Sequence, residues 1–336
     1  MTRSNNTVTS TRFRRMAALA LAAALPLACA SLPLVGARSL DVWGFTAPWD
    51  ARSAASVSAH AGRMQGAVTG WIALDTASGQ PLVIYRDTVA RHASASARFA
   101  LVTSWMGDAF HPSTIRALGA DDARLSQSVA AVASAVANGG YRGAVLDFEE
   151  MTVADLPVTT RIVAAYAKAL RARGVKTVAI AIPALDTAAF PARAFADAVD
   201  LEIVMLYDQH WGAGSPGAIA EPGWVRRALS MRAAEVGAGK LVAALPLYGY
   251  RWKTSAATEI ISYEDARKIA GESGASLDRD QATQTLRAQK PGEWELWVSD
   301  AGLVKALLDE VRSAGVGTVA LWRLGLEDPA VWDVLR

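Results

Sequence analysis

Short apolar runs rich in valine, isoleucine and alanine recur along the chain, separated by stretches with helical periodicity. The runs cover residues 41–46, 66–74, 98–104, 141–148, 175–182, 200–207, 240–247 and 316–323. Apolar runs of this length are typical of strands buried on both faces, as in a parallel sheet. Among the intervening stretches, residues 122–138 and 157–173 place their apolar side chains on one helical face. The pattern therefore predicts strands that alternate with helices.

The number and spacing of the runs favour an α/β fold of the (β/α)8 TIM barrel type over residues 40–336. This span is slightly longer than the ~250 residues usual for that fold. Residues 250–297 account for the excess, because they are polar, contain a helical pattern at 263–272 and precede a helix expected at 299–313. We expect them to form a small lobe inserted between the seventh strand and the following helix. A doubly wound open sheet is the competing fold, but no GxGxxG turn follows the first run.

The N-terminus has the pattern of an export signal. A basic segment that ends at Arg15 precedes the apolar run 16–27, and the small residues Ala28–Ala30 follow it. The run is short for a bilayer span, so we expect cleavage near residue 30 or 37 and no transmembrane span in the mature chain. The segment around Cys29 also resembles a lipoprotein box, which leaves a lipid anchor open. The protein is expected to be exported, as a periplasmic or a secreted protein.

Composition narrows the classes of function. The chain has 34 basic and 32 acidic residues, and residues 1–30 hold four of the arginines, so 30 basic residues remain after cleavage. A chain without a basic face is not expected to bind nucleic acid or an anionic membrane. Cys29 is the only cysteine, so the mature chain has neither a disulfide nor a thiol nucleophile. The histidines are scattered, so we expect neither a metal site nor a cofactor. We also expect the protein to be a monomer.

The most informative segment is the end of the fourth run, where Asp147 and Glu149 lie two residues apart. Side chains alternate along a strand, so both carboxyl groups project to one face and Leu146 and Phe148 to the other. A carboxylate that raises the pKa of a neighbouring acid is the arrangement that general acid catalysis on a glycosidic oxygen needs. Taken alone, the segment fits two solvated acids at the start of a loop equally well.

Aromatic residues at the ends of other strands favour the catalytic interpretation. The active site of a (β/α)8 barrel lies in the loops that follow the strands. Such positions after the first, third, sixth, seventh and eighth runs hold Trp49, Trp105, Tyr207, Asp208, Trp211, Tyr248 and Trp322. Flat apolar rings cover the C–H faces of sugars, while polar groups bind the hydroxyl groups. The set as a whole predicts a carbohydrate site, although any single tryptophan is equally suited to packing.

Four ordered segments resemble family 18 glycoside hydrolases, whose fourth strand ends in a DGxDxDxE pattern. Residues 142–149 match the glycine and the last acid pair of this pattern, whereas Arg142 and Val145 replace its first two aspartates. The other segments look like the sixth, seventh and eighth strand ends of the spore-germination and cell-wall-lytic branch. They are residues 205–211 with 214–217, residues 245–252, and residues 321–325 with 327–329. The resemblance covers roughly residues 40–336.

The resemblance implies a role for each matching residue. Glu149 falls on the acid that protonates the leaving oxygen. Asp147 falls on the carboxylate that holds the substrate's N-acetyl group while its carbonyl oxygen attacks the anomeric carbon, so no enzymic nucleophile is needed. Tyr207 would donate a hydrogen bond to the acetamido oxygen, Asp208 would contact the −1 sugar, and Trp322 would form the floor of that subsite.

Val145 is the departure that bears on activity, because most of the family has an aspartate at this position inside the barrel. The first interpretation is an exported enzyme that cleaves β-1,4 bonds beside N-acetylglucosamine in peptidoglycan, a chitin-like polymer or another envelope glycan. A second is a catalytically silent glycan-binding barrel, and a third is an accessory protein of envelope polysaccharide synthesis or export. The presence of both Glu149 and Asp147 favours the enzyme.

Overall fold

The structure, a computed structural model, describes residues 39–335 except 86, 88, 90–92 and 94–95. The expected export signal and Cys29 lie outside these residues. Among the helices that are described, none combines the length and the apolar character needed to cross a bilayer.

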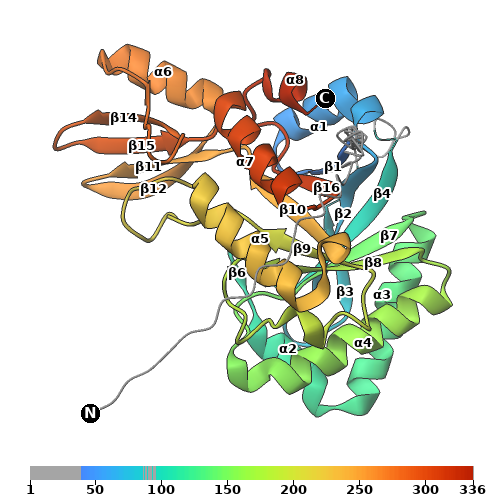
Figure 1. Cartoon of the computed structure of the whole chain (residues 1–336). Helices are drawn as coiled ribbons and strands as arrows, with labels where there is room; N and C mark the ends of the chain where they lie inside the picture. Colours follow the sequence, from blue (N-terminus) through green and yellow to red (C-terminus); the bar gives the residue numbers. More distant parts are fainter. Residues whose placement is uncertain (1–38, 86, 88, 90–92, 94–95, 336) are drawn as a thin grey trace, which may run out of the picture. The chain divides into compact units, whose positions relative to one another are not determined.

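Eight parallel strands close into a barrel (Figure 1). In order around the barrel they are β1 (Asp41–Phe45), β2 (Gly66–Leu74), β4 (Ala97–Thr103), β7 (Gly143–Asp147), β8 (Thr177–Pro183), β9 (Leu201–Met205), β10 (Leu241–Pro246) and β16 (Thr318–Trp322). Strand β1 pairs in parallel with β2 on one side and with β16 on the other, which closes the sheet. The predicted (β/α)8 fold is confirmed, and each apolar run overlaps one barrel strand.

Helices cover the outside of the barrel. They are α1 (Ala51–His60), α2 (Pro112–Ala120), α3 (Asp122–Asn138), α4 (Leu156–Ala172), α5 (Pro222–Val236), α7 (Ala301–Ser313) and α8 (Val331–Val334). Helix α3 begins after Asp121, whose carboxylate accepts a hydrogen bond of 3.0 Å from the Arg124 backbone N–H and so caps the helix. In α4 the buried positions include Ile162, Tyr166 and Leu170, at the spacing of one helical face.

Three connections between barrel strands contain elements other than the expected helix. Strand β2 is followed by β3 (Pro81–Tyr85), which pairs with it in antiparallel fashion. The link from β8 to β9 contains the short 3-10 helix Ala192–Ala194 among its described elements. After β4, the strands β5 (Trp105–Met106) and β6 (Ala109–Phe110) form a small hairpin before α2.

The barrel wall separates two apolar cores. Val145 points into the barrel, where it packs in one cluster with Leu101 and Ala179 of the neighbouring strands. Leu146 and Phe148 point outward and pack in the larger cluster between the strands and the helices. The alternation of side chains along β7 therefore sets which residues face the interior.

A second, antiparallel sheet with one helix lies between β10 and α7. Its strand order is β12 (Ala256–Ile261), β11 (Gly249–Lys253), β15 (Trp294–Val298), β14 (Leu286–Lys290) and β13 (Asp278–Arg279). Helix α6 (Tyr263–Ser273) packs on one face of this sheet (Figure 1). It begins with a capping box between Ser262 and Asp265 and ends at Gly274 in the left-handed conformation. Tyr250 and Trp297 of the opposite face belong to an apolar cluster against which Tyr207 and Trp322 of the barrel pack.

Candidate active site

The end of β7 brings Asp147 and Glu149 together at the mouth of the barrel. Because Asp147 is two residues beyond Val145, it faces the interior, and Glu149 follows on the same side. Both carboxyl groups line a cavity of about 270 Å³, and they form a hydrogen bond with each other.

Aromatic and apolar side chains form most of the cavity wall. Besides the two acids, the lining consists of Phe45, Trp49, Trp71, Leu101, Trp105, Phe110, Ala181, Ile203, Met205, Tyr207, Asp208 and Trp322. Tyr207 and Trp322 stack nearly parallel, with their ring centroids 6.0 Å apart. The arrangement offers flat apolar faces around a small polar centre, as sugar-binding sites do.

The two acids titrate differently because their surroundings differ. Burial raises the pKa of Asp147 to about 6, against the hydrogen bonds from Thr103 and Glu149, which lower it. The pKa of Glu149 is raised well above its usual value by burial first, and then by the negative charges of Asp147 and Asp208. The charge of Asp147 raises the pKa of Glu149, while the hydrogen bond from Glu149 lowers that of Asp147, so Glu149 is the member of the pair that holds the proton and donates it to the Asp147 carboxylate. This is a general acid held beside a carboxylate.

Thr103 holds Asp147 in place. It stands opposite Asp147 in the pairing of β4 with β7, and its hydroxyl donates a 3.0 Å hydrogen bond to Asp147 Oδ2. The same hydroxyl oxygen accepts a 3.0 Å hydrogen bond from the backbone N–H of Trp105. With a donor and an acceptor both satisfied, the Thr103 side chain has one orientation. Thr103 thus gives Asp147 a polar partner inside the barrel. Val145, the preceding inward-facing residue of β7, has no polar group to offer it.

Asp208 is held by two tyrosines of the segment that leads into the lobe. The Tyr248 hydroxyl donates a hydrogen bond to Asp208 Oδ1, and the Tyr250 hydroxyl donates another of 3.0 Å to the same oxygen. Asp208 itself has a left-handed backbone with φ of 57°. Both tyrosine contacts use Oδ1, so these two donors leave Oδ2 free of their hydrogen bonds, and Asp208 is among the residues that line the cavity.

Not every residue expected at the site lines the cavity. Tyr248 is only 3% exposed and lies behind Asp208. Trp211 is 57% exposed on the loop between β9 and α5, outside the cavity lining. The other predicted residues, Glu149, Asp147, Tyr207, Asp208, Trp322, Trp49 and Trp105, all line it.

Sequence reasoning did not find Thr103 or Trp71. Thr103 is the last residue of β4. A polar side chain at the end of a barrel strand is the sequence feature that could have marked it as a site residue. Trp71 lies inside β2, where the apolar run made it look like a packing residue. It lines the cavity, and its indole N–H donates a 3.1 Å hydrogen bond to the Thr46 carbonyl oxygen.

The described residues contain no group of three or more histidine, cysteine, aspartate or glutamate side chains placed to hold a metal ion. The carboxyl groups that line the cavity can transfer protons, and the tyrosine hydroxyl and the aromatic faces around them can bind a sugar.

Known proteins with sequence similarity include lytic enzymes and glycosylases of Bacillus. No family model matches the chain. The chain is 29% identical over 152 residues to the cortical fragment-lytic enzyme of Bacillus subtilis, a match that covers 43% of this chain and 35% of that protein. A sporulation-specific glycosylase of the same organism is 26% identical over 212 residues. The chain spans half or less of the length of these two relatives.

Solved structures with the same fold include cortex-lytic enzymes and chitinases. The spore cortex-lytic enzyme SleL of Bacillus cereus matches with a TM-score of 0.79 and 18% identity, over 89% of this chain and 74% of that one. A family 18 chitinase from Cycas revoluta, solved with (GlcNAc)3, matches with a TM-score of 0.75 and 15% identity, over 88% and 98%. At these identities the structural likeness shows the fold. The resemblance to chitinase-like barrels of family 18, stated from four sequence segments, is confirmed.

Proposed function

We propose that the chain is an exported glycoside hydrolase that cleaves β-1,4 bonds beside N-acetylglucosamine, in peptidoglycan, a chitin-like polymer or another envelope glycan. The observation that carries the proposal is the Asp147–Glu149 pair, in which a protonated acid is hydrogen-bonded to a carboxylate inside an aromatic cavity. Relatives named as cortex-lytic enzymes and chitinases support it.

Glu149 is the proton donor in this proposal. Its proton passes to the glycosidic oxygen as the bond from that oxygen to the anomeric carbon breaks. The raised pKa of Glu149 keeps its carboxyl group protonated to a higher pH than that of an isolated glutamate. Asp147 receives the hydrogen bond of Glu149 before the reaction, and its negative charge stabilises the positive charge that then develops on the sugar.

The substrate's own acetamide replaces an enzymic nucleophile. Its carbonyl oxygen attacks the anomeric carbon, which gives an oxazolinium ion, and water then opens this ion with Glu149 as the base and the anomeric configuration is retained. Asp147 orients the acetamide N–H, and Tyr207 donates a hydrogen bond to its oxygen. Burial raises the pKa of Tyr207 well above its usual value, so this side chain stays a donor. Trp322 forms the floor under the sugar ring.

Charge in the cavity suits a neutral or cationic sugar at the cleaved position. The ionisable lining residues are carboxyl groups and a tyrosine, without lysine or arginine. An N-acetylglucosamine residue is neutral and enters without charge repulsion. The carboxylate of an acidic sugar would be repelled by Asp147 and Asp208, and the lining has no cationic side chain to pair with it.

A catalytically silent glycan-binding barrel is the second candidate, and Val145 favours it. This side chain is fully buried where most family members have an aspartate, so Asp147 has one acid partner instead of two.

Hydrolysis of defined glycans distinguishes the two candidates. The purified protein is incubated with acetylated chitooligosaccharide, with the deacetylated polymer and with purified peptidoglycan, and the products are identified by mass spectrometry. We expect new reducing ends at N-acetylglucosamine from acetylated substrates only. Cleavage of the deacetylated polymer at an equal rate would rule out substrate assistance, and binding of all glycans without products would establish the silent barrel.

A further inference from the structure

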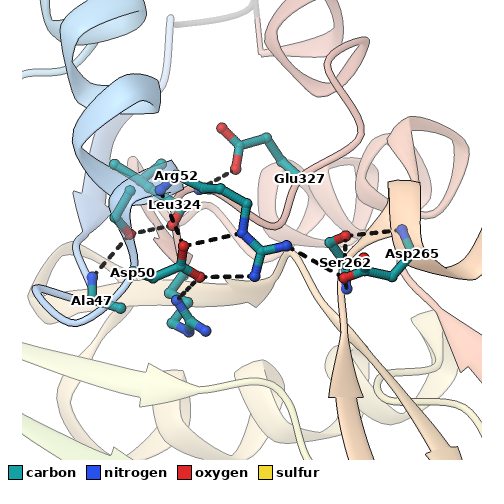
Figure 2. Close-up of polar contacts among 10 residues, drawn as sticks. Ala47, Asp50, Arg52, Ser262, Asp265, Leu324 and Glu327 are labelled. Atoms are coloured by element: carbon teal, nitrogen blue, oxygen red, sulfur yellow. Dashed lines mark hydrogen bonds and ion pairs between the residues drawn. The ribbon is translucent and has the colours of Figure 1, made fainter.

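A chain of charged side chains begins at the cavity rim and runs to the lobe (Figure 2). Asp50 accepts hydrogen bonds from Arg52 Nε at 3.0 Å and Nη2 at 2.9 Å. A second arginine, Arg323, donates a 3.1 Å hydrogen bond from Nη1 to Asp50 Oδ2. Burial raises the pKa of Asp50, but the hydrogen bonds from the two arginines lower it to about 2, so the group is charged at any working pH.

The two ends of the Asp50–Arg323 pair come from the segments that carry two cavity tryptophans. Asp50 directly follows Trp49, and Arg323 directly follows Trp322. The Asp50 and Arg323 side chains are only 11% and 12% exposed, so solvent screens their attraction less than that of a surface pair. The ion pair therefore joins the loop after β1 to the end of β16, beside the cavity.

Trp49 is the cavity residue that this pair supports. Its indole is 46% exposed and stacks on Trp105 with centroids 5.9 Å apart. Trp71 meets it edge-on at 4.9 Å. Tyr85 packs on it in a tilted arrangement, with ring centroids 5.5 Å apart. The charged contact is the guanidinium of Arg323, whose carbon lies 5.8 Å from the Trp49 ring centroid. Because Asp50 is the ion-pair partner of Arg323, loss of the Asp50 charge releases that guanidinium.

Backbone contacts hold the same two segments together independently of the ion pair. The Leu324 N–H donates a 2.9 Å hydrogen bond to the Phe45 carbonyl oxygen. Ser53 bridges the segments, because its hydroxyl donates to the Leu324 carbonyl oxygen and accepts a 3.0 Å hydrogen bond from the Ala47 N–H (Figure 2). Removal of the Asp50 charge should therefore change the orientation of Trp49 while the fold persists.

Arg52 extends the network to the lobe. Its Nη1 atom lies 3.3 Å from Asp265 Oδ2, the carboxylate that also caps α6 through Ser262 (Figure 2). Arg52 and Asp265 are about half exposed, at 51% and 46%, so this link is the weaker part of the network. The stronger part is the buried pair next to Trp49.

We propose that Asp50 and Arg323 are positioning residues that hold the Trp49 indole as a stacking face for a sugar ring at the cavity rim. The inference rests on the proposed function, since it assumes a glycan ligand. Neither Asp50 nor Arg323 contacts the sugar, and both act through Trp49.

The test compares Asp50→Asn with a matched control. Glu310→Gln removes a carboxylate of similar exposure that is also held by an arginine, Arg226, but lies on α7, outside the cavity lining. The first readout needs no glycan: the indole N–H signal of Trp49 in a two-dimensional NMR spectrum, assigned with Trp49→Phe. We expect Asp50→Asn to shift or broaden this signal and Glu310→Gln to leave it in place.

The second readout is binding of chitotetraose by calorimetry, in the Glu149→Gln background so that the ligand is not cleaved. We expect Asp50→Asn to raise Kd about tenfold, and to have no further effect when Trp49→Ala is already present, because residues that act through one group are not additive. An unchanged Trp49 signal in Asp50→Asn, or an equal rise in Kd with and without Trp49, would overturn the inference. If the parent binds no chitooligosaccharide, the proposed function fails, and the NMR signal alone then decides whether Asp50 positions Trp49.

Discussion

Val145→Asp is the substitution that separates the two candidate functions, because it places in the barrel the carboxyl group that most family 18 enzymes have. Val145 has no exposed surface and packs among apolar side chains that include Leu101 and Ala179. A new carboxyl group there, even when neutral, is a buried polar group with few partners and should cost about 1–3 kcal/mol. For a chain of this size we expect the melting temperature to fall by roughly 2 to 5 °C.

The effect on activity follows from the position of the new acid, two residues before Asp147 on the same face of β7. Two carboxyl groups so placed share one proton, which raises the pKa of one of them and changes the balance between Asp147 and Glu149. An enzyme that already works with valine should therefore cleave chitooligosaccharide at the same rate or more slowly after the substitution.

The assay is chitooligosaccharide cleavage from pH 4 to 8 by the parent, Val145→Asp and Val145→Asn, each with a thermal melt. Val145→Asn is the matched control, since it has the polarity and shape of the aspartate without its titration. A parent without activity and a Val145→Asp protein with activity would refute our reasoning and establish a barrel that has lost its chemistry.

Three further predictions follow from single side chains. Asp147→Ala should reduce cleavage of acetylated chitooligosaccharide at least ~100-fold, because the acetamide loses its orienting carboxylate, and a thiazoline analogue of the oxazolinium ion should inhibit the parent; undiminished cleavage, or no inhibition, would contradict the role of Asp147. Tyr248→Phe and Tyr250→Phe should each raise KM more than they change kcat, because Asp208 loses a donor that fixes it; if kcat falls while KM stays constant, Asp208 does not act in binding. Burial raises the pKa of Glu202 to about 8, so above about pH 4.5 the folded state keeps a proton that the unfolded chain releases. The melting temperature of the parent should therefore fall between pH 5 and 8, and that of Glu202→Gln should fall less. Parallel melting curves for the two proteins would show that Glu202 does not contribute to this pH dependence.

The barrel could be predicted from the sequence because its strands are buried on both faces. Each strand then appears as an unbroken apolar run, as in residues 143–147, where Val145 faces inward and Leu146 outward. Strand β3 was not predicted, because it is partly exposed and does not appear as a buried apolar run. It pairs antiparallel to β2 and is not one of the eight barrel strands. No helix was assigned to the link from β8 to β9, and its described helical element is a single 3-10 turn at 192–194.

The site could be predicted where position along a strand decides the geometry. Asp147 and Glu149 at the end of β7, and Trp322 at the end of β16, needed only the rule that strand ends meet at one face of a barrel. The partners of these residues depend on register and on the path of the chain. Thr103 reaches Asp147 because β4 and β7 pair in one particular register, which a single sequence does not reveal.

Tyr248 was expected in the site, but its position also depends on the path of the chain. It stands just after β10, where a contact with the sugar was expected. The chain turns there into β11, which buries Tyr248 and directs its hydroxyl to Asp208. Its relation to the site is thus set by the inserted lobe, whose packing against the barrel a sequence pattern does not give.

The turnover of Glu149→Gln tests the central claim most directly. Glutamine keeps the volume of the side chain and removes its proton, so we expect kcat on acetylated chitooligosaccharide to fall ~100-fold to 10,000-fold while the Kd for the same ligand stays nearly constant. A melting temperature equal to that of the parent shows that the cavity is intact. Equal hydrolysis by Glu149→Gln and the parent would contradict the account, because the protonated Glu149 is the group on which the proposed reaction depends.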